Sequence, residues 1–445
     1  MTHGLEQSTI KRIKATLRVL KAPYALAAFS IASLIRLIPE LESPRYPVGY
    51  DTAFYAYEIL QAPRSSVPAL LVSADLYKII AGCLVKLSGV DAYLLLKLLC
   101  PATYGLLALS YYVFLRSATR WNPRTCLLCT ALFSFQIPSL RLSWDLLKNE
   151  LGMSFLLMFL AVVRKKGLRG KWVLAGLLAL LVTFSHQLPA VLMFTWALYN
   201  VTVWRRSPKN DVRKLLLSLI PAAVFFTYQL LIFLGVLRLP PPPEPHSPTR
   251  TVIRLRPLSL KRPPSRLLKN YFLSPDFLQS SYIDLVVVFT KLMAICYLPL
   301  APLALVGLKR HEDLEPLALW PLLTSVAVLI LPYAYPFYSF FRWLLLLTFP
   351  VSAYATYGFL KLARRGRPWR VGLALLIAFY MVIGFGYASG TVWQLHDEDV
   401  NAYLPWSLLE STIGVSQIDD CVECLRWLSE HAGNGSVLIA EQRFY

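Results

Sequence analysis

The sequence predicts an all-α polytopic membrane protein with about 11 transmembrane helices, a long first outer loop and a small C-terminal α/β unit. Of its 445 residues, 56% are hydrophobic and only 16% are charged, whereas about a quarter of the residues in a soluble domain are charged. The mean hydropathy of +0.51 excludes a disordered chain. Lys and Arg number 45 against 25 Asp and Glu, a net charge of +20. Because these basic residues lie between apolar stretches, they indicate a membrane surface and no nucleic-acid partner.

The predicted transmembrane domain covers residues 1–391. A bilayer-crossing helix needs about 20 mostly apolar residues. Such stretches lie at 18–38, 91–115, 125–143, 151–163, 172–190, 190–204, 215–236, 282–308, 316–332, 342–361 and 371–391. The segment 66–89 is amphipathic and contains Asp75, Lys78 and Lys86, which favours a helix lying at the interface. If it crossed the membrane instead, every later loop would change sides.

The distribution of Lys and Arg predicts the orientation. Every second loop is basic, and basic loops face the cytoplasm, so we expect a cytoplasmic N-terminus and an extracytoplasmic C-terminus. The basic segments are 11–21, 116–124, 164–171, 205–214, 309–310 and 361–370. The outer side then receives the loop 39–90 and the Pro-rich loop 237–281. The second of these is also basic, but long loops are translocated with less regard to charge.

Residues 392–445 form an acidic outer tail, which resembles the start of an α/β unit, with a helix at 422–431 and a strand at 436–445. The tail is too short for a domain of its own. Cys421 and Cys424 form a single CxxC. A zinc site needs a second pair of ligands, so a local disulfide is the remaining alternative to two free thiols.

Polar residues near a membrane are costly and often functional, and two acidic segments lie on the expected outer side. In the segment 47–55, Pro47 and Gly49 precede Asp51. If a helix starts there, Asp51, Tyr55 and Glu58 share one face. The alternative is that Asp51 is only the N-cap of that helix.

The second acidic segment, 143–150, contains Asp145, Lys148, Asn149 and Glu150. In one continuous helix the first three would lie side by side, and Glu150 would point elsewhere. A solvated connection with a local Asp–Lys pair is the plain alternative.

His186 and Arg342 complete the set of candidates. His186 lies about 21 Å along its span, near the outer boundary, where a structural histidine is the commoner case. Arg342 opens a span from the outer side. Its guanidinium either snorkels to the interface or binds a phosphate through paired hydrogen bonds.

The topology and several motifs resemble the GT-C integral-membrane glycosyltransferases, which include oligosaccharyltransferase catalytic subunits, protein O-mannosyltransferases and aminoarabinose transferases. The resemblance is carried by PVGYDTAFY at 47–55, SWDLLKNELG at 143–152, SHQLPA at 185–190, FFRWLLLL at 340–347 and the tail at 424–445. The WWDYG motif of oligosaccharyltransferases is missing, which disfavours asparagine glycosylation.

The resemblance implies an inverting transfer of a sugar from a polyprenyl-phosphate or dolichyl-phosphate donor to a glycan, lipid or protein acceptor at the outer membrane face. Asp51 and Asp145 match the catalytic carboxylates of the first two outer loops. Arg342, with Lys148, matches the donor-phosphate site. Glu150 and His186 are looser matches, as ligands with the two aspartates of a divalent metal such as Mg²⁺ or Mn²⁺.

Two other functional classes remain open at this point. A transporter or flippase of lipid-linked sugars needs polar residues through the middle of several spans and often has internal repeats. Neither is evident, although four basic residues lie within or near spans: Arg36, Lys97, Arg141 and Lys291. A non-catalytic membrane scaffold is the other alternative.

Overall fold

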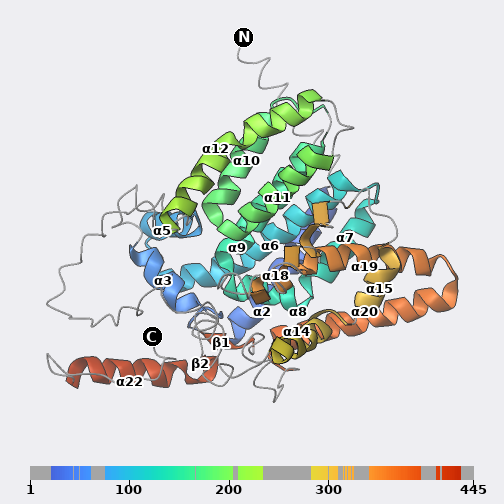
Figure 1. The fold of residues 1–445 in the computed structure, drawn as a ribbon. Helices are drawn as coiled ribbons and strands as arrows, with labels where there is room; N and C mark the ends of the chain where they lie inside the picture. The colour runs from blue at the N-terminus through green and yellow to red at the C-terminus, as the bar shows by residue number, and fades with distance from the viewer. Residues whose placement is uncertain are drawn as a thin grey trace, which may run out of the picture.

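The computed structural model describes residues 22–43, 45–49, 51–61, 76–165, 167–203, 209–233, 282–298, 300–308, 314, 316–317, 319–321, 323–324, 340–391, 407–410 and 413–431. These residues are mostly helical (Figure 1). Five of their helices are long and apolar enough to cross a membrane, or seven if each of two bent helix pairs counts as one span. The architecture is therefore that of an all-α membrane protein. The predicted Pro-rich loop 237–281 lies outside the described residues.

The count of five to seven differs from the predicted 11 because several helices are short or charged. Helix α10 (Lys171–Ser185) has 15 residues and α11 (Gln187–Val203) has 17. Helix α9 (Leu147–Arg164) has 18 residues but contains Lys148, Glu150 and Arg164. Of the predicted span 316–332, residues 325–332 lie outside the described part of the chain.

Four helices form the N-terminal part: α2 (Ala22–Glu42), α3 (Thr52–Gln61), α5 (Leu76–Ser88) and α6 (Ala92–Ala118). Helix α6 begins at an N-cap, where the Asp91 carboxylate accepts a hydrogen bond from the backbone N–H of Tyr93. Helices α2 and α6 pack together closely, because Gly105 has no side chain where Ser33 and Phe29 approach it. The predicted interfacial helix at 66–89 is described from residue 76, and α5 packs against α3 and α6.

The next predicted span is broken into α7 (Pro123–Ser134) and α8 (Ile137–Asp145), which meet at 65°. Pro138 lies in the first turn of α8, where the missing N–H of proline costs nothing. A second break at Leu146, with φ −125° and ψ 47°, separates α8 from α9. These two breaks place Asp145 at the end of a helix.

Helices α10 and α11 pack against α9, and α12 (Lys209–Phe233) packs on α10 and α11 (Figure 1). The predicted boundary between the fifth and sixth spans at residue 190 is wrong, because His186 adopts an extended conformation and ends α10 four residues earlier. Gly176 allows α10 to approach the backbone of Ser218 in α12. The turn at 186 therefore lies at the α8–α9 end of this layer.

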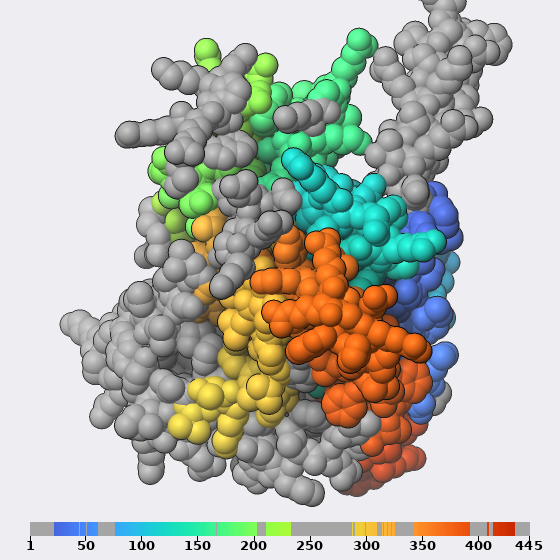
Figure 2. Space-filling model, turned by 90° about the vertical axis from the view of Figure 1, so that its right-hand side faces the viewer, coloured from blue at the N-terminus to red at the C-terminus, as the bar shows by residue number. Residues whose placement is uncertain are grey.

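The C-terminal part of the domain contains α14 (Tyr282–Tyr297), α15 (Ala301–Gly307), α18 (Phe340–Leu346), α19 (Thr348–Ala363) and α20 (Arg367–Ala388). Helices α14 and α15 meet at 82°. Gly307 and Gly358 let α15 and α19 cross with their backbones in close contact. Figure 2 shows α19 and α20, in orange, at the surface.

Along α20, exposed apolar side chains recur at a helical spacing, at Val371, Leu375, Phe379 and Val382. An apolar stripe of this kind on a monomer needs an apolar environment, which a bilayer provides. On the buried side, Tyr111, Phe133 and Phe349 pack ring to ring, with centroids 4.7 to 5.4 Å apart. They join α6, α7 and α19 into one core.

The tail begins with two short antiparallel strands, β1 (Leu409–Glu410) and β2 (Ile413–Gly414), followed by the 3₁₀ turn η4 (Val415–Gln417) and α22 (Ile418–His431). The predicted helix at 422–431 is present and starts four residues earlier. Cys421 and Cys424 lie on α22 as free thiols. The predicted strand at 436–445 lies outside the described residues.

Candidate functional site

Two acidic segments that are far apart in the chain meet in the fold. Residues 45–49 lead from α2 to Asp51 at the start of α3, and α8 ends at Asp145. Gly49 has φ +157°, and a Cβ atom there would overlap the carbonyl oxygen of Trp144. The segment that precedes Asp51 therefore lies directly on the residue that precedes Asp145.

The charges of this cluster act on Asp51. The pKa of the Asp51 carboxyl is raised to about 6, first by burial and then by the negative charge of Asp145. Arg342, Lys148 and Arg141 oppose this rise, because a nearby cation favours an ionised carboxylate. At neutral pH, Asp51 is therefore ionised but holds a pKa close to that pH.

Asp51 lies at the N-cap position of α3, where the backbone carbonyl accepts the first hydrogen bond of the helix, but its carboxylate makes no capping hydrogen bond in the described segments. The backbone carbonyl of Asp51 accepts from the N–H of Tyr55 at 2.9 Å, and the hydroxyl of Thr52 donates to the carbonyl of Gly49 at 3.0 Å. Within the described segments, the Asp51 carboxylate itself receives no hydrogen bond. Its acceptor oxygens are therefore available to a ligand.

Asp145 and Lys148 do not lie on one continuous helix, because the break at Leu146 separates them. Asp145 forms an ion pair with Arg141, one turn earlier on α8. Lys148 lies 3.1 Å from Glu58 of α3, and its ammonium group is 5.3 Å from the ring centre of Tyr55. Asp51, Tyr55 and Glu58 thus share the predicted face of α3, and this face is turned toward Lys148.

Arg342 is half-buried on α18, which packs against α8. Its positive charge lowers the pKa of both Asp51 and His186. This places a guanidinium beside the two acidic segments, where the sequence could only suggest an arginine at the head of a span.

His186 lies in the turn between α10 and α11, close to the same cations. Its Nδ1 atom accepts a hydrogen bond from the backbone N–H of Leu188 at 3.1 Å. Burial, with the charges of Arg342 and Lys148, lowers the pKa of His186 to about 3. The ring is therefore neutral, with its proton on Nε2. Gly152 of α9 has Pro189 and Ser185 within van der Waals reach, which seats this turn against α9.

The predicted metal ligands do not come together. Glu150 is fully buried, and Thr103 of α6 donates to its Oε2 at 3.1 Å, on the α6 side of α9 and apart from the cluster around Asp51. A metal-binding histidine donates its second N–H to an acceptor, whereas Nδ1 of His186 is itself an acceptor. In the described ranges, no three His, Cys, Asp or Glu side chains are grouped to hold a metal. The four-ligand metal site stays a prediction.

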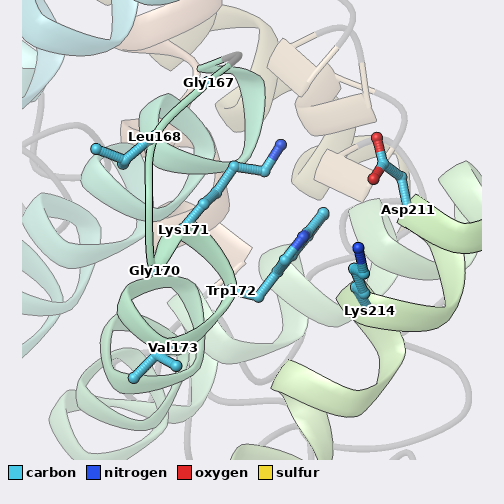
Figure 3. A pocket seen from close by; sticks show the side chains of 8 residues that line it. All are labelled: Gly167, Leu168, Gly170, Lys171, Trp172, Val173, Asp211 and Lys214. Carbon is cyan, nitrogen blue, oxygen red and sulfur yellow. The ribbon is translucent and has the colours of Figure 1, made fainter.

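A separate surface pocket of about 570 Å³ lies at the other end of α10 (Figure 3). Its polar lining residues are Lys171, Trp172, Asp211 and Lys214, and the Lys171 ammonium lies 4.4 Å from the Trp172 ring centre. Because α10 is about 22 Å long, this pocket is remote from His186. None of the predicted site residues lines it.

Two side chains that bear on the site were not among the sequence candidates. Arg141 pairs with Asp145, and the signal for it was the i, i+4 spacing on a helix. Glu58 binds Lys148, and the sequence placed it on the right face of α3 without indicating its partner.

Comparison with known proteins adds no assignment: no protein-family model matches the chain, and no curated protein matches its sequence. The class that the fold defines is an all-α membrane protein with five to seven apolar candidate spans.

Proposed function

We propose that this protein is an inverting membrane glycosyltransferase that moves a sugar from a polyprenyl-phosphate donor to an acceptor hydroxyl. One observation carries the proposal: the contact of Gly49 with the Trp144 carbonyl brings together the segments of Asp51 and Asp145, which are 94 positions apart in the sequence. Arg342, Lys148 and Arg141 are close enough for their charges to lower the pKa of Asp51. Two neighbouring carboxylates beside positively charged side chains suit a reaction that removes a proton and releases a phosphate. The motifs resembling GT-C enzymes lie at the same residues.

Asp51 is the general base in this proposal. A sugar hydroxyl has a high pKa and needs a base near its proton as it attacks. A base is most effective when its pKa lies near the working pH, as that of Asp51 does at about 6. Asp145 is held by Arg141, so it keeps its charge, and its role is to raise the pKa of Asp51 and to bind hydroxyl groups.

Arg342 and Lys148 bind the donor phosphate. The acceptor oxygen forms a bond to the anomeric carbon of the sugar as the bond from that carbon to the phosphate oxygen breaks. Attack from the opposite face inverts the anomeric centre. The proton moves to Asp51, and the phosphate keeps the electron pair. Guanidinium and ammonium groups stabilise that developing negative charge. The Nε2–H of His186 is a further donor toward the phosphate.

The reaction takes place at the outer membrane face in this proposal. The basic loops put the N-terminus in the cytoplasm and both acidic segments outside. If α9, α10 and α11 also cross the bilayer, and the segment 316–332 does so as well, the number of crossings is 11, and the C-terminus is extracytoplasmic. A polyprenyl donor then reaches the cluster from the lipid.

A transfer assay tests the function. The purified protein is reconstituted in liposomes with a panel of polyprenyl-phosphate hexoses and pentoses, and the release of polyprenyl phosphate is measured with and without sugar and lipid acceptors. We expect release that depends on an acceptor and on Asp51. Binding of a donor without release would favour a transporter, and absence of both would favour a scaffold. Full activity of both Asp51→Ala and Asp145→Asn would overturn the site.

A further inference from the structure

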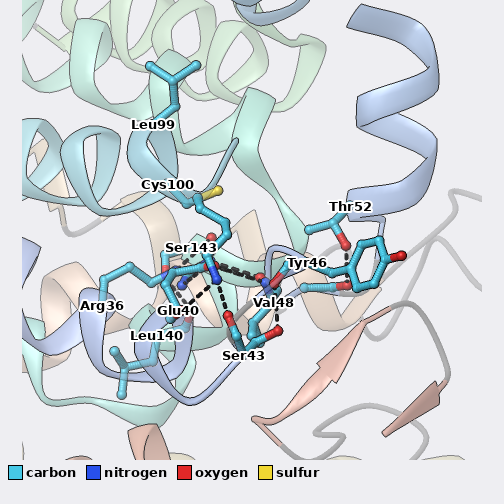
Figure 4. A network of polar contacts seen from close by, with 12 residues as sticks. Arg36, Glu40, Ser43, Tyr46, Val48, Thr52, Leu99, Cys100, Leu140 and Ser143 are labelled. Atoms are coloured by element: carbon cyan, nitrogen blue, oxygen red, sulfur yellow. Dashed lines mark hydrogen bonds and ion pairs between the residues drawn. The ribbon is translucent and has the colours of Figure 1, made fainter. Parts of the chain in front are cut away.

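A buried ion pair on α2 binds the two segments that carry the acidic residues. Arg36 is fully buried, and its Nη1 lies 2.6 Å from Oε1 of Glu40. Its Nη2 donates to the carbonyl of Val48 at 2.9 Å, and its Nε donates to the carbonyl of Ser143 at 3.4 Å. Figure 4 shows these contacts converging on one guanidinium. The side chain thus joins α2, the segment 45–49 and α8.

Glu40 completes this arrangement from the other side. Its carboxylate accepts the backbone N–H of Val48, at 3.3 Å to Oε1 and 3.2 Å to Oε2. Both polar backbone groups of Val48 are therefore bound by the ion pair. Lys97 of α6 fixes the end of α2, because its ammonium donates to the backbone carbonyls of Glu40 and Ser43.

The bound carbonyls lie close to the acidic residues. Val48 is three positions before Asp51, and Ser143 is two positions before Asp145. Trp144 lies between Ser143 and Asp145 in the chain. The centre of its ring is 5.5 Å from the guanidinium carbon of Arg36 and 6.0 Å from that of Arg141. One planar, rigid group therefore binds a carbonyl of each segment.

An ion pair inside a membrane helix is a poor source of stability. Its desolvation offsets most of the attraction, and a matched apolar pair is often at least as stable. Ionisable residues within membrane segments are costly and tend to serve function. The value of Arg36 therefore lies in geometry, since a guanidinium presents five N–H donors in one plane.

We propose that Arg36, held by Glu40, is a positioning residue that sets the spacing of Asp51 and Asp145. The effect on catalysis rests on the proposed function, whereas the effect on the two segments does not. A lysine keeps the charge but cannot direct three donors along fixed vectors. When the hydrogen bonds of Arg36 are weakened, the two segments can separate. Asp51 is then less buried, and the charge of Asp145 raises the pKa of Asp51 less.

Three variants in nanodiscs test the proposal: Arg36→Lys, the charge-neutral double variant Arg36→Met with Glu40→Leu, and Arg116→Lys as a control. Arg116 is also an arginine on a helix that binds a backbone carbonyl, that of Trp121, at the α6–α7 turn. The readouts are thermal unfolding, hydrogen exchange of residues 140–146, and turnover against pH. In this segment Ser143 and Trp144 contact Arg36, whereas the Glu40 carboxylate binds the N–H of Val48. Exchange of residues 140–146 therefore does not simply report a lost bond to the carboxylate.

We expect faster exchange of residues 140–146 in both Arg36 variants, with the double variant unfolding near the wild-type temperature. Turnover should fall about 100-fold, the order expected when a reacting group is misplaced by about 1 Å. The acidic limb of the turnover–pH profile should move to lower pH, because the pKa of Asp51 falls. The donor KM should change little. The control should match the wild type in every readout.

Unchanged exchange in both Arg36 variants, or an equal change in Arg116→Lys, would overturn the proposal. If the wild type transfers no sugar, the proposed function fails, but the exchange of residues 140–146 still decides whether Arg36 holds the two segments. If exchange is faster in the Arg36 variants but turnover and the pH profile are those of the wild type, Arg36 has only a structural role. That result would also overturn the positioning role.

Discussion

Gly49 lies so close to the carbonyl oxygen of Trp144 that a Cβ atom at position 49 would overlap it. This contact joins the first acidic segment to the second, 95 positions later in the chain. The same contact brings Asp51 and Asp145 together, because Asp51 is two residues after Gly49 and Asp145 directly follows Trp144. A glycine that sequence inspection treats as a turn former is thus the point at which the candidate site is assembled.

Gly49→Ala should separate the two segments. Its Cβ overlaps the Trp144 carbonyl, and the positive φ adds backbone strain. Overpacking of this kind costs about 1 to 3 kcal/mol. We expect a lower unfolding temperature and loss of transfer activity. Gly89→Ala is the matched control, because Gly89 has φ +69° with nothing within 4 Å of a Cβ. That variant should lose about 1 kcal/mol from backbone strain and keep its activity.

Asp51→Asn should abolish turnover while leaving the fold intact. Loss of a general base costs about 100-fold to 10,000-fold in rate, and the described structure shows no capping bond that the substitution would break. Asp91→Asn is the control, since Asp91 is an acidic residue at the start of another helix, where its carboxylate is a cap. Circular dichroism and transfer rates measure both. A similar fall in rate for the two variants would contradict a specific role for Asp51.

The pH profile of kcat/KM should rise through about pH 6, the pKa of Asp51 in the folded protein, because the base must be deprotonated. Asp145→Asn removes a negative charge, which lowers the pKa of Asp51 and moves this limb to lower pH. Lys148→Met removes a positive charge, which raises the pKa and moves the limb to higher pH. Shifts in the same direction would count against Asp51 as the titrating group.

Arg342→Gln should weaken binding of the donor. A hydrogen bond to a charged group contributes about 1.5 to 3 kcal/mol, which corresponds to about a 10-fold to 100-fold rise in the donor KM. Arg342→Lys should lie between this variant and the wild type, because it keeps the charge and loses the planar fork. Arg45→Gln, which removes an exposed arginine from the same predicted face, should leave the KM unchanged.

Thiol labelling should show that both acidic segments face outward. Cys83 and Cys424 are exposed and should react with an impermeant reagent added to intact cells. After both are replaced by serine, Phe54→Cys near Asp51 should react from outside. Lys165→Cys, in a basic loop, should react only after the membrane is opened. The reverse pattern would place the site in the cytoplasm and would remove the outer-face assignment.

The membrane class, the positions of several helices and the candidate site residues could be predicted from the chain alone. Apolar length and the spacing of Lys and Arg are local properties, so the positions of α2, α6, α12 and α20 could be predicted from them. The shared face of Asp51, Tyr55 and Glu58 followed from helical periodicity alone.

Which of the candidate residues lie close together depends on how the helices break and pack. The break at Leu146 turns Lys148 toward Glu58, and the packing of α9 on α6 directs Glu150 to Thr103 and away from the other acidic residues. Neither a break between two apolar helices nor a contact across 90 positions leaves a periodic signal in the chain. The i, i+4 spacing could have indicated Glu40 as a partner of Arg36. The other two partners are the backbone carbonyls of Val48 and Ser143, and every residue has a carbonyl, so no sequence pattern could have identified them.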